Sequence, residues 1–140
     1  MSEQDTRAAV TGLYDAYARR DFDRVASYID DDIDWIIYAP INVFPFVGAR
    51  RGKTAVLEAL GGIARDYELA RYEPKVMLVE GDRAAVMSEV AFKQRTSGRL
   101  LSFQLANFLR VRDGRVVEFR EFANTFDIVE QALGREIELS

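Results

Sequence analysis

Three short turn signals divide the second half of the chain at nearly even spacing, and they constrain its fold more than any other feature. Gly81-Asp82, Ser97-Gly98 and Asp113-Gly114 each separate two segments rich in residues that favour β-strands. Two-residue loops of this composition join antiparallel neighbours in hairpins. The sequence therefore predicts a meander of four antiparallel strands. These strands are expected near residues 71–79, 83–95, 99–112 and 115–123.

The first half of the chain predicts helices around a single strand. Residues 4–20 carry apolar side chains at helical spacing, and "DFDRVASYI" repeats that pattern briefly. "DDDIDWIIYA" is typical of a strand, and "PINVFPFVGARRG" of an apolar loop. Residues 56–67 predict a third helix, and "DIVEQALG" a short last helix that ends at Gly134. The expected fold class is α+β, in the order helix, helix, strand, helix, four strands and a short helix.

Composition narrows the classes of function. A length of 140 residues fits one domain, expected to span residues 1–140, and a net charge of -4 offers no basic field for nucleic acid. The chain has no cysteine and no histidine, so acid–base chemistry must depend on carboxylates, tyrosine or lysine. We expect no metal and no cofactor, because the acidic run around Asp30 to Asp34 is typical of a solvated loop.

The location of the protein follows from two further features. The start "MSEQDTRAAV" lacks the basic and apolar regions of a signal peptide. No apolar run approaches the roughly 20 residues that a membrane-spanning helix needs. We therefore expect a cytoplasmic protein without a membrane partner.

A carboxylate in an apolar row marks the candidate site. Glu121 shares a strand face with Val117, Phe119 and Ala123, because side chains alternate along a strand. Two-residue turns would place both Glu121 and Glu89 beside Ala106, on one face of the sheet. The same register adds further residues to this face: Gln104, Met87, Phe108 and Phe119. Apolar walls with a few convergent polar groups are typical of a site for a small hydrophobic molecule.

The opposite face of the meander is also expected to be apolar. It would carry the row from Leu101 to Val111, with Phe103 and Leu105 near its middle. An apolar face needs a cover, and the helices are already assigned to the first face. The sequence therefore predicts a homodimer through the outer face of the sheet.

The order of elements and three local patterns resemble the nuclear-transport-factor-2-like superfamily, and its SnoaL-like members in particular. The patterns are "DDDIDWIIYAP", "VGARRGKTAV" and "FLRVRDGRVVEFREF". The resemblance implies a cone-shaped, curved antiparallel sheet wrapped around helices, with an internal cavity. The superfamily contains isomerases, dehydratases, cyclases, epoxide hydrolases and non-catalytic binders, so the fold alone does not choose a function.

Carried over residue by residue, most chemistries of the superfamily lack their groups here. The acidic base of steroid isomerases is missing from "WIIYAP". The Arg-x-Asp pair of limonene-epoxide-hydrolase-like enzymes is missing from "MSEVAF". The chain also has no histidine for a scytalone-dehydratase-like site. SnoaL-like cyclases and epoxide hydrolases present an aspartate in the last strand, and "VEFRE" puts Glu121 at that position.

The expected function is cofactor-independent carboxylate acid–base chemistry, of the isomerase, cyclase or dehydratase type, on a small apolar carbonyl or hydroxyl compound. Glu121 would move a proton, while Glu89 and Gln104 would orient or share it. Aromatic side chains and the loop from Pro40 to Val47 would shape the cavity, although each aromatic is also compatible with a plain core role. These aromatics are Tyr14, Tyr17, Trp35, Tyr38 and Phe46. The alternative is a non-catalytic ligand-binding or dimerisation module.

Overall fold

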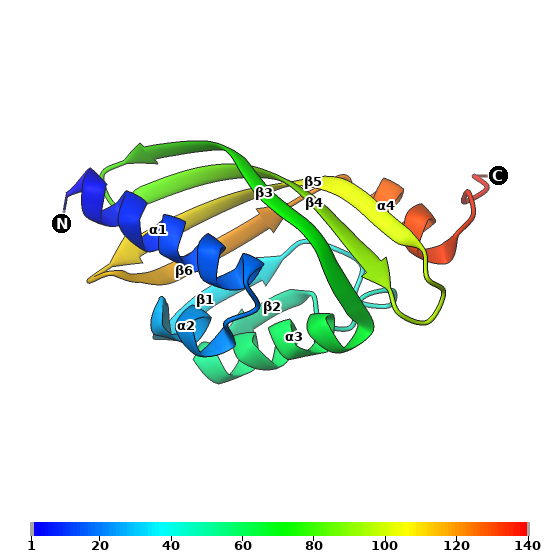
Figure 1. Cartoon of the computed structure of the whole chain (residues 1–140), viewed down its shortest axis with the longest axis horizontal. Helices are drawn as coiled ribbons and strands as arrows, with labels where there is room; N and C mark the ends of the chain where they lie inside the picture. Colours follow the sequence, from blue (N-terminus) through cyan, green and yellow to red (C-terminus); the bar gives the residue numbers. More distant parts are fainter. Residues whose placement is uncertain (1, 140) are drawn as a thin grey trace.

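A curved, open sheet forms the body of the molecule, and helices α1 to α3 lie against its inner side (Figure 1). The computed structural model describes residues 2–139. The sheet has six strands in the order β2-β1-β6-β5-β4-β3. Its strands are β1 (Ile29–Ile37), β2 (Gly48–Arg51), β3 (Tyr67–Glu80), β4 (Arg83–Gln94), β5 (Leu100–Arg112) and β6 (Arg115–Phe122). The helices are α1 (Glu3–Ala18), α2 (Phe22–Ser27), α3 (Lys53–Asp66) and α4 (Thr125–Leu133). The expected α+β fold with a curved sheet is confirmed.

Local signals account for most of these elements. Ser2 caps α1 in a reciprocal capping box with Asp5, which satisfies backbone donors that a helix start leaves free. Gly134 ends α4 in the left-handed conformation, with a φ of 72°. The predicted turns at Gly81-Asp82 and Asp113-Gly114 are confirmed, because the residues that flank each of them pair directly. The edge strand β2 lies in the segment expected to be a loop, and it pairs with β1.

A β-bulge in the β5–β6 hairpin changes which residues of β5 share a face of the sheet with Glu121. Val111 pairs with Val116 as the two-residue turn requires, but the next pair is Arg110 with Glu118, so Val117 is an extra residue. Beyond the bulge Glu121 lies opposite Asn107, not opposite Ala106 as expected. A shift of one residue exchanges the two faces of a strand. The expectation that Glu121 shares a face with Ala106 is therefore corrected.

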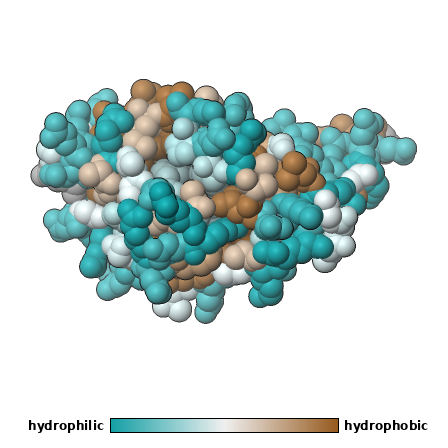
Figure 2. Space-filling model, in the orientation of Figure 1, coloured by the Kyte–Doolittle hydropathy of each residue, from teal (hydrophilic) through white to brown (hydrophobic). Residues whose placement is uncertain are grey.

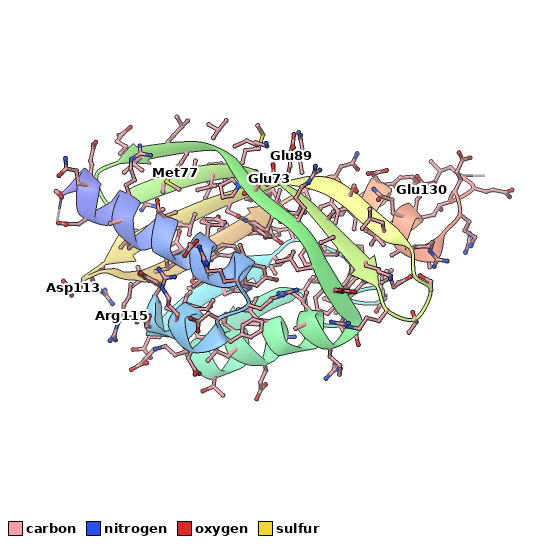
Figure 3. The ribbon with its side chains drawn as sticks, viewed as in Figure 1. Glu73, Met77, Glu89, Asp113, Arg115 and Glu130 are labelled. Carbon is pink, nitrogen blue, oxygen red and sulfur yellow. The ribbon has the colours of Figure 1, made fainter. Side chains whose placement is uncertain are left out.

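The β4–β5 connection also differs from the expected two-residue turn. Lys93 pairs with Leu100, so the connection is longer and Glu89 lies opposite Gln104 instead of Ala106. This change moves the register by two positions and keeps Glu89 and Gln104 on one face. That face is the outer one, and Figure 3 shows Glu89 and Glu73 at the side of the sheet that points away from the helices. Glu89 and Glu121 therefore lie on opposite faces.

The two apolar faces of the meander are exchanged relative to the prediction. Leu101, Leu105 and Leu109 are buried on the inner side, and Phe103 packs against the same core. Met87 and Phe108 are 41% and 53% exposed on the outer side. The row from Leu101 to Val111 is thus the inner wall of the sheet, which helices cover, and it cannot be the predicted dimer surface.

The glycines of two helices provide a matched test of this geometry. Gly61 lies within α3, and a methyl group there would meet open space, so Gly61→Ala should raise the free energy of unfolding by about 0.5–1 kcal/mol. Gly134→Ala should lower it by about 1 kcal/mol, because a left-handed φ is unfavourable for alanine and Arg99 already occupies the space. Denaturant unfolding of both variants measures the two effects. Equal signs for the two substitutions would contradict the structure.

Candidate functional site

A mostly apolar, partly open cavity lies between the inner side of the sheet and the helices. Its volume is about 140 Å³. A cavity of about 150 Å³ with apolar walls holds a molecule of the size of benzene. Side chains from all four helices, from five strands and from the segments after β1 and β6 line it. Seven residues expected at the site are among them: Glu121, Tyr14, Tyr17, Trp35, Tyr38, Phe46 and Phe119.

Glu121 is the single ionisable carboxyl among the residues that line this cavity. The bulge in β6 aims it inward, and β1 lies beside it because Ile37 pairs with Glu121. Asn107 Nδ2 donates a hydrogen bond of 3.0 Å to Glu121 Oε1. The hydroxyl of Tyr14 donates to Asn107 Oδ1 over 2.5 Å, which fixes the orientation of the amide. A short chain of hydrogen bonds therefore holds one carboxylate oxygen and leaves the other for a ligand.

The surroundings of Glu121 favour its neutral form. Removal of the carboxyl from water raises its pKa from the ordinary 4.5 to about 7, although the bond from Asn107 acts in the opposite direction. A carboxyl with a pKa near neutrality is present in both forms at physiological pH. It can therefore take up a proton and return it, as general acid–base catalysis requires.

Three tyrosines form a cluster beside this carboxyl. The rings of Tyr14 and Tyr17 lie 5.8 and 5.3 Å from the ring of Tyr72. Burial raises the pKa of each hydroxyl, and the charge of Glu121 adds to the rise. The three hydroxyls therefore stay neutral and act as hydrogen-bond donors or acceptors.

An aromatic pair forms the wall on the side of β1 and β6. Trp35 stacks on Phe119 with ring centroids 3.9 Å apart and planes inclined by 12°. Trp35 is 5% exposed, and its indole Nε1 has no hydrogen-bond partner among residues 2–139. Phe44 and Phe46 of the loop after β1 are among the residues that line the cavity as well.

Four of the expected site residues lie outside the cavity. Glu89, Gln104, Met87 and Phe108 are on the outer side of the sheet, for the reasons of register given above. Lys75 Nζ lies 3.8 Å from Glu89 and 2.8 Å from Glu73, so Glu89 belongs to a surface group of charges. The predicted sharing of a proton between Glu89 and Glu121 is corrected.

Sequence reasoning missed two residues of the site, Asn107 and Tyr72. Asn107 is fully buried between Leu105 and Leu109 on the inner face of β5. The sign that singled out Glu121, a polar residue in an apolar row, was present here too. Tyr72 gave no comparable sign, because an aromatic residue is ordinary in a strand.

The acidic run before Trp35 takes part in ion pairs at the surface. Lys53 Nζ lies 3.3 Å from Asp31, and Arg120 Nη2 lies 3.2 Å from Asp34. Within the described part of the chain, acidic side chains nowhere form a group of three or more that could hold a metal ion. Residues 2–139 also contain no helix that is both long and apolar enough to span a membrane.

Comparison with solved structures identifies the fold. A protein from Rhodopseudomonas palustris, provisionally assigned as an isomerase, is 40% identical over 90% of this chain and 93% of its own, with a TM-score of 0.81. An NTF2-like protein of unknown function from Burkholderia pseudomallei is 21% identical, covers 94% of this chain and 98% of its own, and has a TM-score of 0.84. An LEH-like epoxide hydrolase from M. tuberculosis has a TM-score of 0.77 at 17% identity, covering 94% and 91%. None of the curated proteins compared with the chain matches it.

The family of the chain follows from its sequence. The profile of the SnoaL-like domain matches residues 10–119, which is most of the chain and ends two residues before Glu121. The matched segment contains Tyr14, Trp35 and Asn107, which surround that carboxyl or share its cavity. The chain belongs to the SnoaL-like family of NTF2-like proteins.

Proposed function

We propose that this protein is a cofactor-independent enzyme in which Glu121 moves a proton within a small, mostly apolar carbonyl or hydroxyl compound. One observation supports this most directly: the cavity encloses a single carboxyl, held by Asn107, with a pKa of about 7. The likeness to a protein provisionally assigned as an isomerase, at 40% identity, favours an isomerase over a cyclase or dehydratase. The whole chain would act as one SnoaL-like domain.

The carboxyl of Glu121 can both accept and return the proton in such a step, so no second acid or base is needed. Ionised Glu121 takes a proton from the carbon next to a carbonyl group, and the electrons of the broken C–H bond form an enolate. The same carboxyl then returns the proton to another carbon of the conjugated system. The mostly apolar walls strengthen the electrostatic interactions of Glu121 with a bound molecule. The substrate must be small, because a cavity of about 140 Å³ has room for about one ring.

The alternative is a ligand-binding module without catalysis, whose buried carboxyl only solvates a bound polar group. Both hypotheses require a ligand in the cavity, but only the enzyme converts that ligand to a product. Small ketones in D2O separate them, since removal of an α-proton by a base exchanges it for deuterium whatever the natural substrate is.

Glu121→Gln should abolish proton transfer while keeping the shape of the side chain and the bond from Asn107. We expect the wild-type protein to accelerate deuterium exchange into cyclohexanone, and the variant to lose about 100-fold or more of that rate. Proton NMR measures the exchange. Glu89→Gln is the matched control, because Glu89 lies on the outer side of the sheet, and it should retain the wild-type rate. Absence of any acceleration by the wild-type protein would favour the binding module.

The pKa of Glu121 predicts how stability depends on pH. Its carboxyl binds a proton more tightly in the folded state, so the free energy of unfolding should fall as pH rises from 4.5 to about 7. The loss is on the order of 3 kcal/mol. Glu121→Gln removes this dependence, so it should be more stable than wild type at pH 8 and nearly equal at pH 4. Urea unfolding of both proteins at the two pH values tests this. A difference that does not change with pH would contradict the raised pKa.

We also propose that two copies associate through the outer side of the sheet. Large apolar side chains are exposed there, and neighbouring strands bring them together: Val76, Leu78, Met87, Phe108, Phe122 and Tyr38. Tyr38 stacks on Phe122 at 4.7 Å, and Phe108 meets Phe122 edge-on at 5.9 Å. Figure 2 shows hydrophobic residues at the upper edge of the molecule, above β3 in the view of Figure 1. An apolar patch bordered by both Lys75 and Glu89 is suited to an identical surface related by a two-fold axis.

Phe108→Glu should convert the protein to monomers, since a dimer would bury an unpaired charge. Sedimentation velocity at micromolar concentration measures the change. Leu139→Glu is the control, because Leu139 is exposed but lies outside this patch, and it should leave association unchanged. A wild-type protein that sediments as a monomer would refute the dimer.

A further inference from the structure

The side-chain amide of Asn107 contacts Glu121, and the two ends of an amide act on a carboxyl in opposite ways. The NH2 end donates a hydrogen bond, which favours the ionised carboxylate. The carbonyl end can only accept a bond, and so favours the protonated carboxyl. In the structure the NH2 end faces Glu121, with Nδ2 3.0 Å from Oε1. The direction of the amide therefore decides whether Asn107 lowers or raises the pKa of Glu121.

Packing alone does not fix the direction of this amide. Its oxygen and nitrogen are nearly the same size, so half a turn of the side-chain amide exchanges them without changing its shape. Asn107 is fully buried on the inner face of β5. Water therefore does not replace a bond that a reversed amide would lose, and the neighbouring polar groups must determine the direction.

Tyr14 is the neighbour that distinguishes the two directions. Its hydroxyl donates to Asn107 Oδ1 over 2.5 Å. If the amide were reversed, this hydroxyl would face the NH2 end, which is another donor, and its proton would lose its acceptor. Tyr14 is itself buried, so that loss would be unfavourable. The bond from α1 thus favours the amide direction that stabilises ionised Glu121.

We propose that Tyr14 is a positioning residue, which holds the amide of Asn107 with Nδ2 toward Glu121 and so makes this carboxyl easier to ionise than its burial alone would allow. The inference deepens the proposed function, and it rests on that function only for its effect on rate. A base that takes a proton from carbon must be ionised first. Tyr14 would therefore increase the fraction of molecules that are ready to react near neutral pH.

Other titratable groups beside Glu121 must be separated from this effect. They are the hydroxyls of Tyr14 and Tyr17 from α1 and of Tyr72 from β3, and burial keeps all three neutral. Arg20 adds a positive charge beside them, with its guanidinium 4.9 Å from the ring of Tyr17. The residues paired with Glu121 on β1 and β5 carry no charge. Tyr72→Phe is the matched control, because it removes a neutral hydroxyl that interacts with Glu121 but does not orient the amide.

The protonation of Glu121 can be measured without any substrate. A sample labelled with ¹³C in the glutamate carboxyl groups gives NMR signals that follow ionisation, and Glu121→Gln identifies the signal of Glu121 by its loss. The wild-type carboxyl should titrate near pH 7. We expect Tyr14→Phe to raise the proton affinity of Glu121 by about 3- to 10-fold, which is the net effect of one hydrogen bond. Tyr72→Phe should change it far less.

Two further readouts separate positioning from a merely structural role. Asn107→Leu removes the amide, so adding Tyr14→Phe to that variant should leave the proton affinity of Glu121 unchanged. In the exchange reaction of cyclohexanone, Tyr14→Phe should move the midpoint of the pH profile upward by the same factor as in the NMR titration. The rate well above that midpoint should be retained, whereas a structural defect would lower the rate at every pH.

Equal effects of Tyr14→Phe and Tyr72→Phe, or a lower proton affinity in Tyr14→Phe, would overturn the inference. An effect of Tyr14→Phe that persists beside Asn107→Leu would also overturn it, because the hydroxyl would then act on Glu121 directly. If Tyr14→Phe does not fold, the wild-type protein still decides. One Nδ2 proton of Asn107 must move downfield as Glu121 ionises, and a signal that ignores this titration refutes the inference.

The outcome for Tyr14 and the outcome for the proposed function are distinguishable. A raised proton affinity in Tyr14→Phe, in a protein that exchanges no deuterium, would support the role of Tyr14 and refute the proton transfer. Exchange that depends on Glu121 but an unchanged titration in Tyr14→Phe would leave the proposed function standing and refute the role of Tyr14.

Discussion

One extra residue in β6 determines which residues of β5 meet Glu121 inside the sheet. Val117 bulges out of the β5–β6 ladder, and all residues beyond it exchange faces relative to β5. Glu121 consequently meets Asn107 inside the sheet instead of Ala106 outside it. Without the bulge the carboxyl would lie opposite Ala106, on the outer face that also carries Met87 and Glu89. The bulge also brings two valines, Val116 and Val117, into buried positions.

Burial of Glu121 is unfavourable for the stability of its ionised form. Its single side-chain hydrogen bond, from Asn107, does not replace the water that an ionised carboxylate loses, so the pKa rises to about 7. The rest of the site keeps this bond in place: Tyr14 orients the Asn107 amide, and α1 holds Tyr14 against the sheet. Such a polar group is retained at a cost to stability, which is typical of functional sites.

The sequence was sufficient to predict most helices and strands, but it was insufficient to predict the register in which the strands pair. Capping residues, helical spacing and turn dipeptides indicated each helix and the long strands, because these signals are local. The β5 partner of Glu121 was not predictable in this way, because no residue type uniquely marks a bulge and the hairpin turn at Asp113-Gly114 has the expected two residues. The length of the β4–β5 connection was predicted wrongly for a different reason, because "RTSGR" is compatible with loops of several lengths. The first error came from assuming uninterrupted pairing, and the second from assuming a two-residue loop.

The arrangement of polar groups in the cavity defines what it can distinguish. An apolar cavity alone separates ligands poorly, since one methylene group changes binding by only about 1–3 kcal/mol. A polar group inside such a cavity discriminates more strongly, because a ligand that leaves it unpaired loses a hydrogen bond. Glu121 is the carboxyl among the lining residues, so a ligand with a polar group placed to meet it gains an interaction that the apolar walls do not offer. Under the proposed function this carboxyl adds a second requirement, a removable proton within its reach, and a ligand without one would bind and not react.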